Sequence, residues 1–294
     1  ISRELKRNVA KRGRTAGDYV AENAQRRTEQ RHQFKPKLVK FSRSMKEQAV
    51  KWLTNEKWSP EIISIEGHRT GKCPVSIEWL YRWIWQSKHG NKRVDRGYKR
   101  IYQLLKHGKR RRKRGARKDS RGIIHHRVPI EKRPKVVKRV RPGDIEVDFM
   151  MGKNHKGALI VMIDRASLKT SLKKVEGKDS REIKNRIVKR LSSLKGIIKT
   201  LTFDNDKAFS KHESIAKKLN AKSYFTRPYT SQDKGSVENR IGLIRRFFPK
   251  KTDLRKINDK EVAHVERMIN NRPVRKFNYQ TPNQIFSKKI ALMC

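Results

Sequence analysis

The feature that most constrains the fold is a series of short apolar runs that begins near Gly143. GDIEVDFMMG, GALIVMIDRAS and TSLKKVEG are bounded by turn residues, and they predict three consecutive antiparallel strands. Apolar residues then recur at helical spacing between positions 179 and 195. GIIKTLTFDND predicts a fourth strand, 210–219 a helix, SYFTRPY a fifth strand, and KGSVENRIGLIRRFFPK a further helix.

Three strands, helix, strand, helix, strand, helix is the element order of the ribonuclease-H-like fold. We therefore predict an α/β domain over residues 143–294, with a mixed five-stranded sheet and flanking helices. An all-α region precedes it.

Three acidic residues stand out by their positions in these elements. Alternation in the first strand places Asp148 and Glu146 on one face, and a carboxylate in mid-strand is unusual unless it is paired or binds an ion. Asp204 ends the fourth strand, where ligands gather at the carboxyl edge of α/β sheets. Glu238 is the single acid of the last helix, which is otherwise rich in cations.

Carboxylates from three separate elements suit a hard cation. Mg²⁺ (or Mn²⁺) prefers such oxygen ligands and keeps positions open for a phosphate. Two such ions could activate a water or a 3′-hydroxyl and stabilise the leaving oxygen, without a protein nucleophile. We predict that Asp148, Asp204 and Glu238 are both the catalytic residues and the metal ligands.

The last helix allows two interpretations. Val237, Ile241, Ile244 and Phe248 form an apolar stripe that should pack on the sheet. Glu238, Gly242 and Arg245 lie on the adjacent face, which suits either a metal–phosphate site or a packed helix that tolerates Gly242.

Other titratable residues have simpler predicted roles. We expect Glu146 to form a salt bridge with a lysine, or else to act as an auxiliary ligand. Asp206 should face solvent, and Asp164 should pair with Arg165 or a neighbour. The nine histidines have no zinc-ligand spacing and are interpreted as surface or DNA-contacting residues.

The formal net charge of +49 indicates a polyanionic partner, and double-stranded DNA is the expected one. No apolar run reaches the length of a spanning helix, so no membrane partner is predicted.

The two cysteines are far apart in the sequence and do not suggest a disulfide framework, which is typical of an intracellular protein. Lys106–Lys118 carries nine cations and no acid, which predicts a flexible linker over 106–142. This linker either contacts DNA through Arg110, Arg111, Arg112, Lys113 and Arg114 or is a solvated tether.

The segment 37–105 predicts a helix-turn-helix. Apolar residues at helical spacing follow Ser42, Ser59-Pro60-Glu61 has the pattern of a helix start, and a helix over 74–88 should bury Ile77, Leu80, Tyr81 and Ile84. Ser76, Glu78 and Arg82 would then face the major groove. An ordinary three-helix bundle with a basic surface is the alternative.

Several of these stretches together resemble one known family. The sequence is similar to the IS-thirty family of bacterial insertion-sequence transposases in ISRELKRN, WSPEIIS, VSIEWLYRWI, RPGDIEVDFMMG, LIVMIDRAS, TFDNDKAF, YFTRPYTSQDKGSVENRIGLIRRFFPKKTDL and INNRPVRKFNYQTPNQIF. The 33 residues between Asp204 and Glu238 equal the family's spacing. Departures from its pattern are Ile145, Asp206 and Ile241, where tryptophan, glycine and asparagine are usual.

The resemblance implies an Asp-Asp-Glu triad of Asp148, Asp204 and Glu238, with Asn205 and Asn239 as supporting active-site residues. Arg245 and Arg246 are expected to contact DNA. It also implies a homodimer or larger assembly on transposon ends and target DNA. Because the chain begins at Ile1, residues 1–36 are interpreted as the remnant of a further helix-turn-helix and its linker.

We therefore predict a transposase that binds terminal inverted repeats and catalyses Mg²⁺-dependent cleavage and strand transfer. Two alternatives stay open: a truncated or repurposed DNA-binding protein without catalysis, and a ribonuclease H or structure-specific nuclease.

Overall fold

The computed structural model describes residues 2–14, 16–34, 41–90, 97–106, 124–134, 140–227 and 235–293. They belong to two compact units, Ile1–Lys46 and Glu47–Cys294, which are described separately. The five cations predicted to contact DNA from the basic linker, Arg110 to Arg114, lie outside the described residues.

The first unit contains α1 (Ser2–Asn8) and α2 (Ala21–Phe34). Arg27 of α2 donates from Nη1 to the Asn8 carbonyl oxygen at 2.6 Å, so the end of α1 rests against α2. α1 covers most of ISRELKRN, the first of the stretches that resemble the transposase family.

The second unit opens with three helices, α3 (Arg43–Thr54, which starts in the first unit), α4 (Pro60–Thr70) and α5 (Ile77–His89). Ser59 and Pro60 take the predicted places at the start of α4. The predicted start of α5 at Pro74 is wrong, because Ser76 caps this helix by accepting a hydrogen bond from the Trp79 N–H.

The buried face of α5 also differs from the prediction. Leu80 and Ile84 are buried as expected, but Trp83 and Ser87 complete the buried face, and Tyr81 is exposed. Both sets fit helical spacing, so the periodicity alone did not distinguish them.

The rest of this unit is built on one sheet. Its elements are β1 (Asp144–Met151), β2 (Ala158–Asp164), β3 (Thr170–Val175), α6 (Ser180–Leu191), β4 (Thr200–Phe203), α7 (His212–Leu219), β5 (Lys222–Phe225), α8 (Gly235–Ile244), α9 (Asp259–Asn270) and α10 (Pro282–Ala291). The strand order is β3-β2-β1-β4-β5. β1, β2 and β3 are antiparallel, whereas β4 and β5 run parallel to β1. The predicted element order is confirmed, and this mixed five-stranded sheet with flanking helices fits a ribonuclease-H-like fold.

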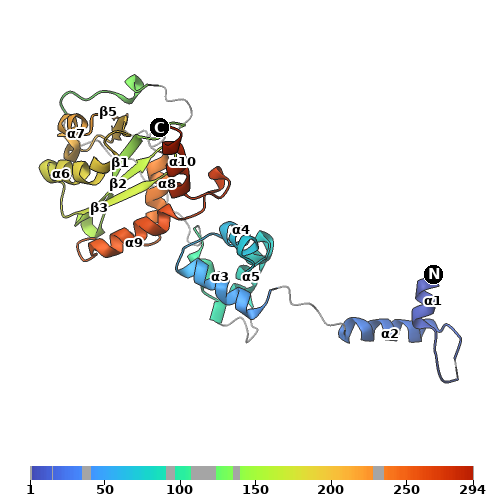
Figure 1. Ribbon diagram of the computed structural model, residues 1–294. Helices are drawn as coiled ribbons and strands as arrows, with labels where there is room; N and C mark the ends of the chain where they lie inside the picture. Colours follow the sequence, from blue (N-terminus) through green and yellow to red (C-terminus); the bar gives the residue numbers. More distant parts are fainter. Residues whose placement is uncertain are drawn as a thin grey trace. The chain divides into compact units, whose positions relative to one another are not determined.

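Each face of the sheet carries its own core (Figure 1). α6 and α7 pack against Leu201, Phe203 and their neighbours on one face. α8 and α9 pack on the other face, where Val237, Ile244 and Phe248 are buried and Ile241 is partly buried. The predicted apolar stripe of α8 is therefore confirmed.

Candidate functional site

The register of β1 and β4 bears on the placement of two predicted site residues. Asp144 pairs with Thr200 and Glu146 with Thr202 in this parallel pair. The ladder ends there and β4 ends at Phe203; the same register continued by two residues would bring Asp148 opposite Asp204, on the face that carries Glu146. Both aspartates are partly buried.

Glu146 connects this pair of strands to α8. Its side chain is fully buried and accepts hydrogen bonds from the Arg165 Nε at 2.9 Å and from the Val237 backbone N–H at 3.1 Å. The predicted salt bridge is present, but with an arginine rather than a lysine. Sequence reasoning missed the bond to Val237, which attaches the first turn of α8 to β1.

Glu238 directly follows Val237 and is exposed on the first turn of α8. Among the residues that the structure describes, no three acidic, histidine or cysteine side chains form a group that could hold a metal ion. The three predicted ligands are all described residues, and the structure does not bring them into one metal-binding group.

Asn205 supports the loop that follows β4. Its side chain is buried, donating from Nδ2 to the Thr226 carbonyl oxygen at 2.7 Å and accepting from the Arg127 Nη1 at 2.6 Å. These bonds fix the backbone next to Asp204, and the supporting role of Asn205 in the active site stays a prediction. Asn239, the other predicted supporting residue, is exposed on α8.

The structure tests three predictions about other titratable groups, and those for Asp206 and His212 are wrong. Asp206 is partly buried, caps the turn at Ala208 and pairs with Lys178. Asp164 accepts hydrogen bonds from the Gly143 N–H at 2.7 Å and from Ser167, so its partner is a neighbour rather than Arg165, which was one of the two predicted alternatives; burial raises its pKa despite these bonds. His212 is buried between Ser223 and the His125 carbonyl oxygen, and is no surface residue.

The arginines of α8 are engaged with the protein itself. Arg245 donates from Nη2 to the Met151 carbonyl oxygen at 2.6 Å, and Arg246 donates to the carbonyl oxygens of Lys57 and Leu104. Burial lowers the pKa of both guanidinium groups. Their DNA contact stays a prediction, and it would require these groups to leave or share their carbonyl partners.

The groove-facing candidates of α5 are all exposed. The hydroxyl of Ser76 is already used as the helix cap, whereas Arg82 lies over the ring of Trp79 at 5.5 Å. Trp79 and Trp85 are also exposed, and Trp85 stacks on the ring of Tyr102. The density of aromatic residues in IEWLYRWIW was the available signal for this surface.

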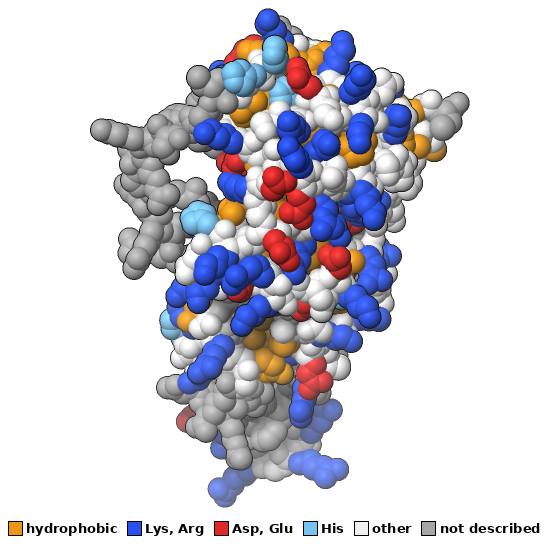
Figure 2. All heavy atoms as spheres, turned by 90° about the vertical axis from the view of Figure 1, so that its left-hand side faces the viewer, with side chains coloured by type: hydrophobic (Ala, Val, Ile, Leu, Met, Phe, Trp, Pro, Cys, Tyr) orange, Lys and Arg blue, Asp and Glu red, His pale blue; other side chains and the backbone are white. Residues whose placement is uncertain are grey.

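Lys and Arg side chains are spread over the displayed face of the molecule, with a smaller group of acidic side chains near its middle (Figure 2). This distribution fits a surface that meets polyanions at more than one place. No helix among the described residues is long and apolar enough to span a membrane.

Comparison with known proteins connects this geometry to one group of proteins. The chain is 39% identical over 291 residues to the transposase for insertion sequence element IS4351 of Bacteroides fragilis, covering 99% of this chain and 86% of the relative. It is 30% identical over 301 residues to transposase InsI for insertion sequence element IS30A of Escherichia coli (strain K12), covering 99% of this chain and 76% of the relative.

No family model matches the chain. A solved structure with partial similarity is the catalytic core domain of BIV integrase, with 17% identity, 51% of this chain and 97% of that chain covered, and a TM-score of 0.39. The likeness to the transposases extends over nearly the whole of this chain and over more than three quarters of each of the two relatives. The chain belongs to the family of insertion-sequence transposases that includes those of IS4351 and IS30.

Proposed function

We propose that this protein is a DNA transposase that binds the inverted-repeat ends of its element and catalyses metal-dependent DNA cleavage and strand transfer. The observation that carries this proposal is the 39% identity to a transposase over 99% of the chain. The parallel register of β1 and β4, which if continued by two residues would bring Asp148 opposite Asp204, supports the chemistry.

The three predicted carboxylates have the ligand chemistry that a divalent metal such as Mg²⁺ prefers. Asp148 on β1 and Asp204 directly after β4 would offer hard oxygen donors, and Glu238 would add a third carboxylate from the first turn of α8. A pair of Mg²⁺ or Mn²⁺ ions held there would supply activation of the attacking hydroxyl and stabilisation of the leaving oxygen.

The remaining residues prepare the site for a phosphodiester. Glu146 holds the start of α8 against β1, and Asn205 holds the loop that carries Asp204. Asn239 is exposed one residue beyond Glu238, where it could reach the DNA. Since strand transfer joins two DNA ends, we also propose that the protein acts as a homodimer or larger assembly on DNA.

The test uses the full chain and a plasmid that carries its gene with the flanking DNA on both sides. Incubation with Mg²⁺ should yield cleaved ends and joined products. Asp204→Asn and Glu238→Gln should each reduce product formation by at least about a hundred-fold, since each removes a charged ligand. Asp206→Asn is the matched control and should stay within about three-fold of the wild type.

Two further measurements on the wild-type chain, a gel shift and cleavage of other nucleic-acid substrates, distinguish the alternative functions. If the wild-type chain shifts the DNA in a gel but forms no product, it is a DNA-binding protein without catalysis. Cleavage of RNA–DNA hybrids or junctions without end joining would instead indicate a nuclease.

A further inference from the structure

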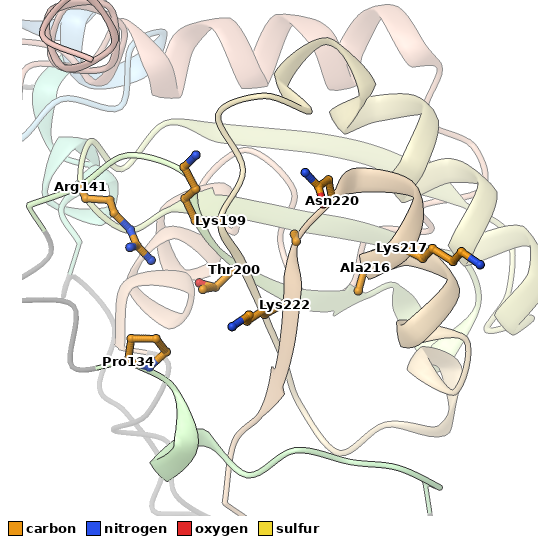
Figure 3. Close-up of a pocket in the computed structure, with 9 residues that line it drawn as sticks. Pro134, Arg141, Lys199, Thr200, Ala216, Lys217, Asn220 and Lys222 are labelled. Carbon is orange, nitrogen blue, oxygen red and sulfur yellow. The ribbon is translucent and has the colours of Figure 1, made fainter. Parts of the chain in front are cut away.

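A hollow of about 440 Å³ opens at the amino ends of β4 and β5 (Figure 3). Four cationic side chains line it together with Thr200 and Asn220: Arg141, Lys199, Lys217 and Lys222. No acidic side chain is among its lining residues in the described part of the chain. A lining with four cations and no acid favours the binding of an anion.

Hydrogen bonds to the buried Asp144 carboxylate hold two of the lining side chains of the hollow in place. Thr200 is in register with Asp144 on β1 and with Lys222 on β5, so the three side chains form one row on the same face of the sheet. The buried carboxylate of Asp144 accepts a hydrogen bond from the Thr200 hydroxyl at 2.6 Å. It also accepts two hydrogen bonds from Arg141, at 3.1 and 3.0 Å.

The two hydrogen bonds to Asp144 hold the Arg141 side chain next to the row formed by Asp144, Thr200 and Lys222. A bidentate pair with a buried carboxylate limits the rotamers of the guanidinium, whereas a solvated lysine has no such restraint. Figure 3 shows Arg141 and Lys222 extending toward Thr200, while Lys199 and Lys217 point away from it. Arg141 and Lys222 thus form the inner part of the hollow, and the other two lysines form its rim.

The hollow is distinct from the candidate catalytic edge. Asp204 follows the carboxyl end of β4, whereas Thr200 begins this strand. Four residues of extended chain span about 13 Å, so a phosphate at Thr200 is not the one that Asp204 would meet. A hollow of about 440 Å³ is also larger than a single phosphate requires.

We propose that this hollow binds the sugar–phosphate backbone of DNA, several nucleotides away from the phosphodiester at Asp204 or on a second duplex. This inference rests on the proposed function in that it takes DNA as the ligand. It adds a contact that extends the DNA-binding surface of the catalytic domain around the edge strand β5. The inner cations hold one phosphate, and the rim lysines meet its neighbours.

Fluorescence anisotropy of the full chain with a labelled 40-base-pair duplex, over a range of salt concentrations, tests the proposal. The variant is Lys199→Gln/Lys217→Gln/Lys222→Gln, which leaves Arg141 and its partner in place. Lys189→Gln/Lys211→Gln/Lys260→Gln is the control, because these lysines are equally exposed and lie outside the hollow. Thermal melting of both variants checks that they are folded.

The hollow variant should bind at least about ten-fold more weakly at 0.15 M salt, with a salt slope reduced by about 2 to 3, as expected for lost phosphate contacts. The control should change the slope by less than about 1. An equal loss of DNA affinity in the two variants would overturn the proposal. Such a result would show that only the total positive charge of the protein matters, and not the position of the lysines.

A second arm separates DNA from a small anion. If inorganic phosphate raises the melting temperature of the wild type but not of the hollow variant, while DNA affinity is the same in both, the site takes a free anion and the proposal is wrong. The proposed function fails separately, through absence of cleavage by the wild type, whatever the binding of the hollow variant.

Discussion

The buried carboxylate of Glu146 accepts a hydrogen bond from the backbone N–H of Val237 at 3.1 Å, and this bond joins β1 to the first turn of α8. Glu146 lies two residues from Asp148, and Val237 directly precedes Glu238. The same carboxylate pairs with Arg165 at 2.9 Å. One buried side chain thus links the strand and the helix that carry two of the three predicted ligands.

Glu146→Ala should therefore lower the free energy of unfolding by about 3 kcal/mol, because it leaves Arg165 and the Val237 N–H without their acceptor. Glu182→Ala removes an exposed helical ion pair with Arg186 and should cost less than about 0.5 kcal/mol. Urea denaturation of both variants measures the difference. Equal costs would show that the bond between β1 and α8 adds no stability.

Asn205→Ala should destabilise the protein by about 1 to 3 kcal/mol, since the buried Thr226 carbonyl oxygen and the Arg127 guanidinium lose their partner. Cleavage should fall more than DNA affinity does, because the loop next to Asp204 loosens. Asn239→Ala, at an exposed position, should change stability by less than about 0.5 kcal/mol. Denaturation, anisotropy and cleavage assays on the two variants provide the comparison.

Gly143→Ala should cost at least about 2 kcal/mol, or prevent folding. Gly143 has a φ of 94°, and an added Cβ would lie 2.0 Å from the carbonyl oxygen of Ile197. Gly177→Ala is the control, because no atom lies within 4 Å of its added Cβ. Thermal melting of the two variants tests this, and similar melting temperatures would contradict the close approach at Gly143.

Gly242→Ala should stabilise α8 by about 0.5 to 1 kcal/mol, because the added methyl meets open space and alanine favours helix. The cleavage assay then distinguishes the two interpretations of this face of α8. A stabilised variant with reduced cleavage indicates that DNA approaches the helix at Gly242. Unchanged cleavage indicates a packed helix in which glycine has no functional role.

Burial raises the pKa of the Cys73 thiol to about 11. Because the folded pKa exceeds the unfolded one, the contribution of this group to stability is complete below the unfolded pKa and is lost as the pH rises toward 11. At pH 8 the thiolate fraction is only about 0.1%, so labelling by a thiol reagent should be at least about a hundred-fold slower than in urea. The Cys294→Ser variant leaves Cys73 as the single thiol, and fast labelling of the native variant would contradict its burial.

The sequence by itself determined the order of the elements and the face of each strand. The alternation through β1 and the apolar stripe of α8 are local patterns, and each follows from the geometry of one element. The carboxylate in mid-strand at Asp148 and the acid at the end of β4 were visible for the same reason. These features led to the correct fold class and to the candidate site.

The tertiary structure decided which side chains meet. The parallel register pairs Glu146 with Thr202, the Glu146 side chain bonds to Arg165 and Val237, and His212 is buried. On α5, Trp83 rather than Tyr81 enters the core. Each of these outcomes depends on contacts between residues far apart in the chain, and the periodicity of a single segment contains no information about its partner.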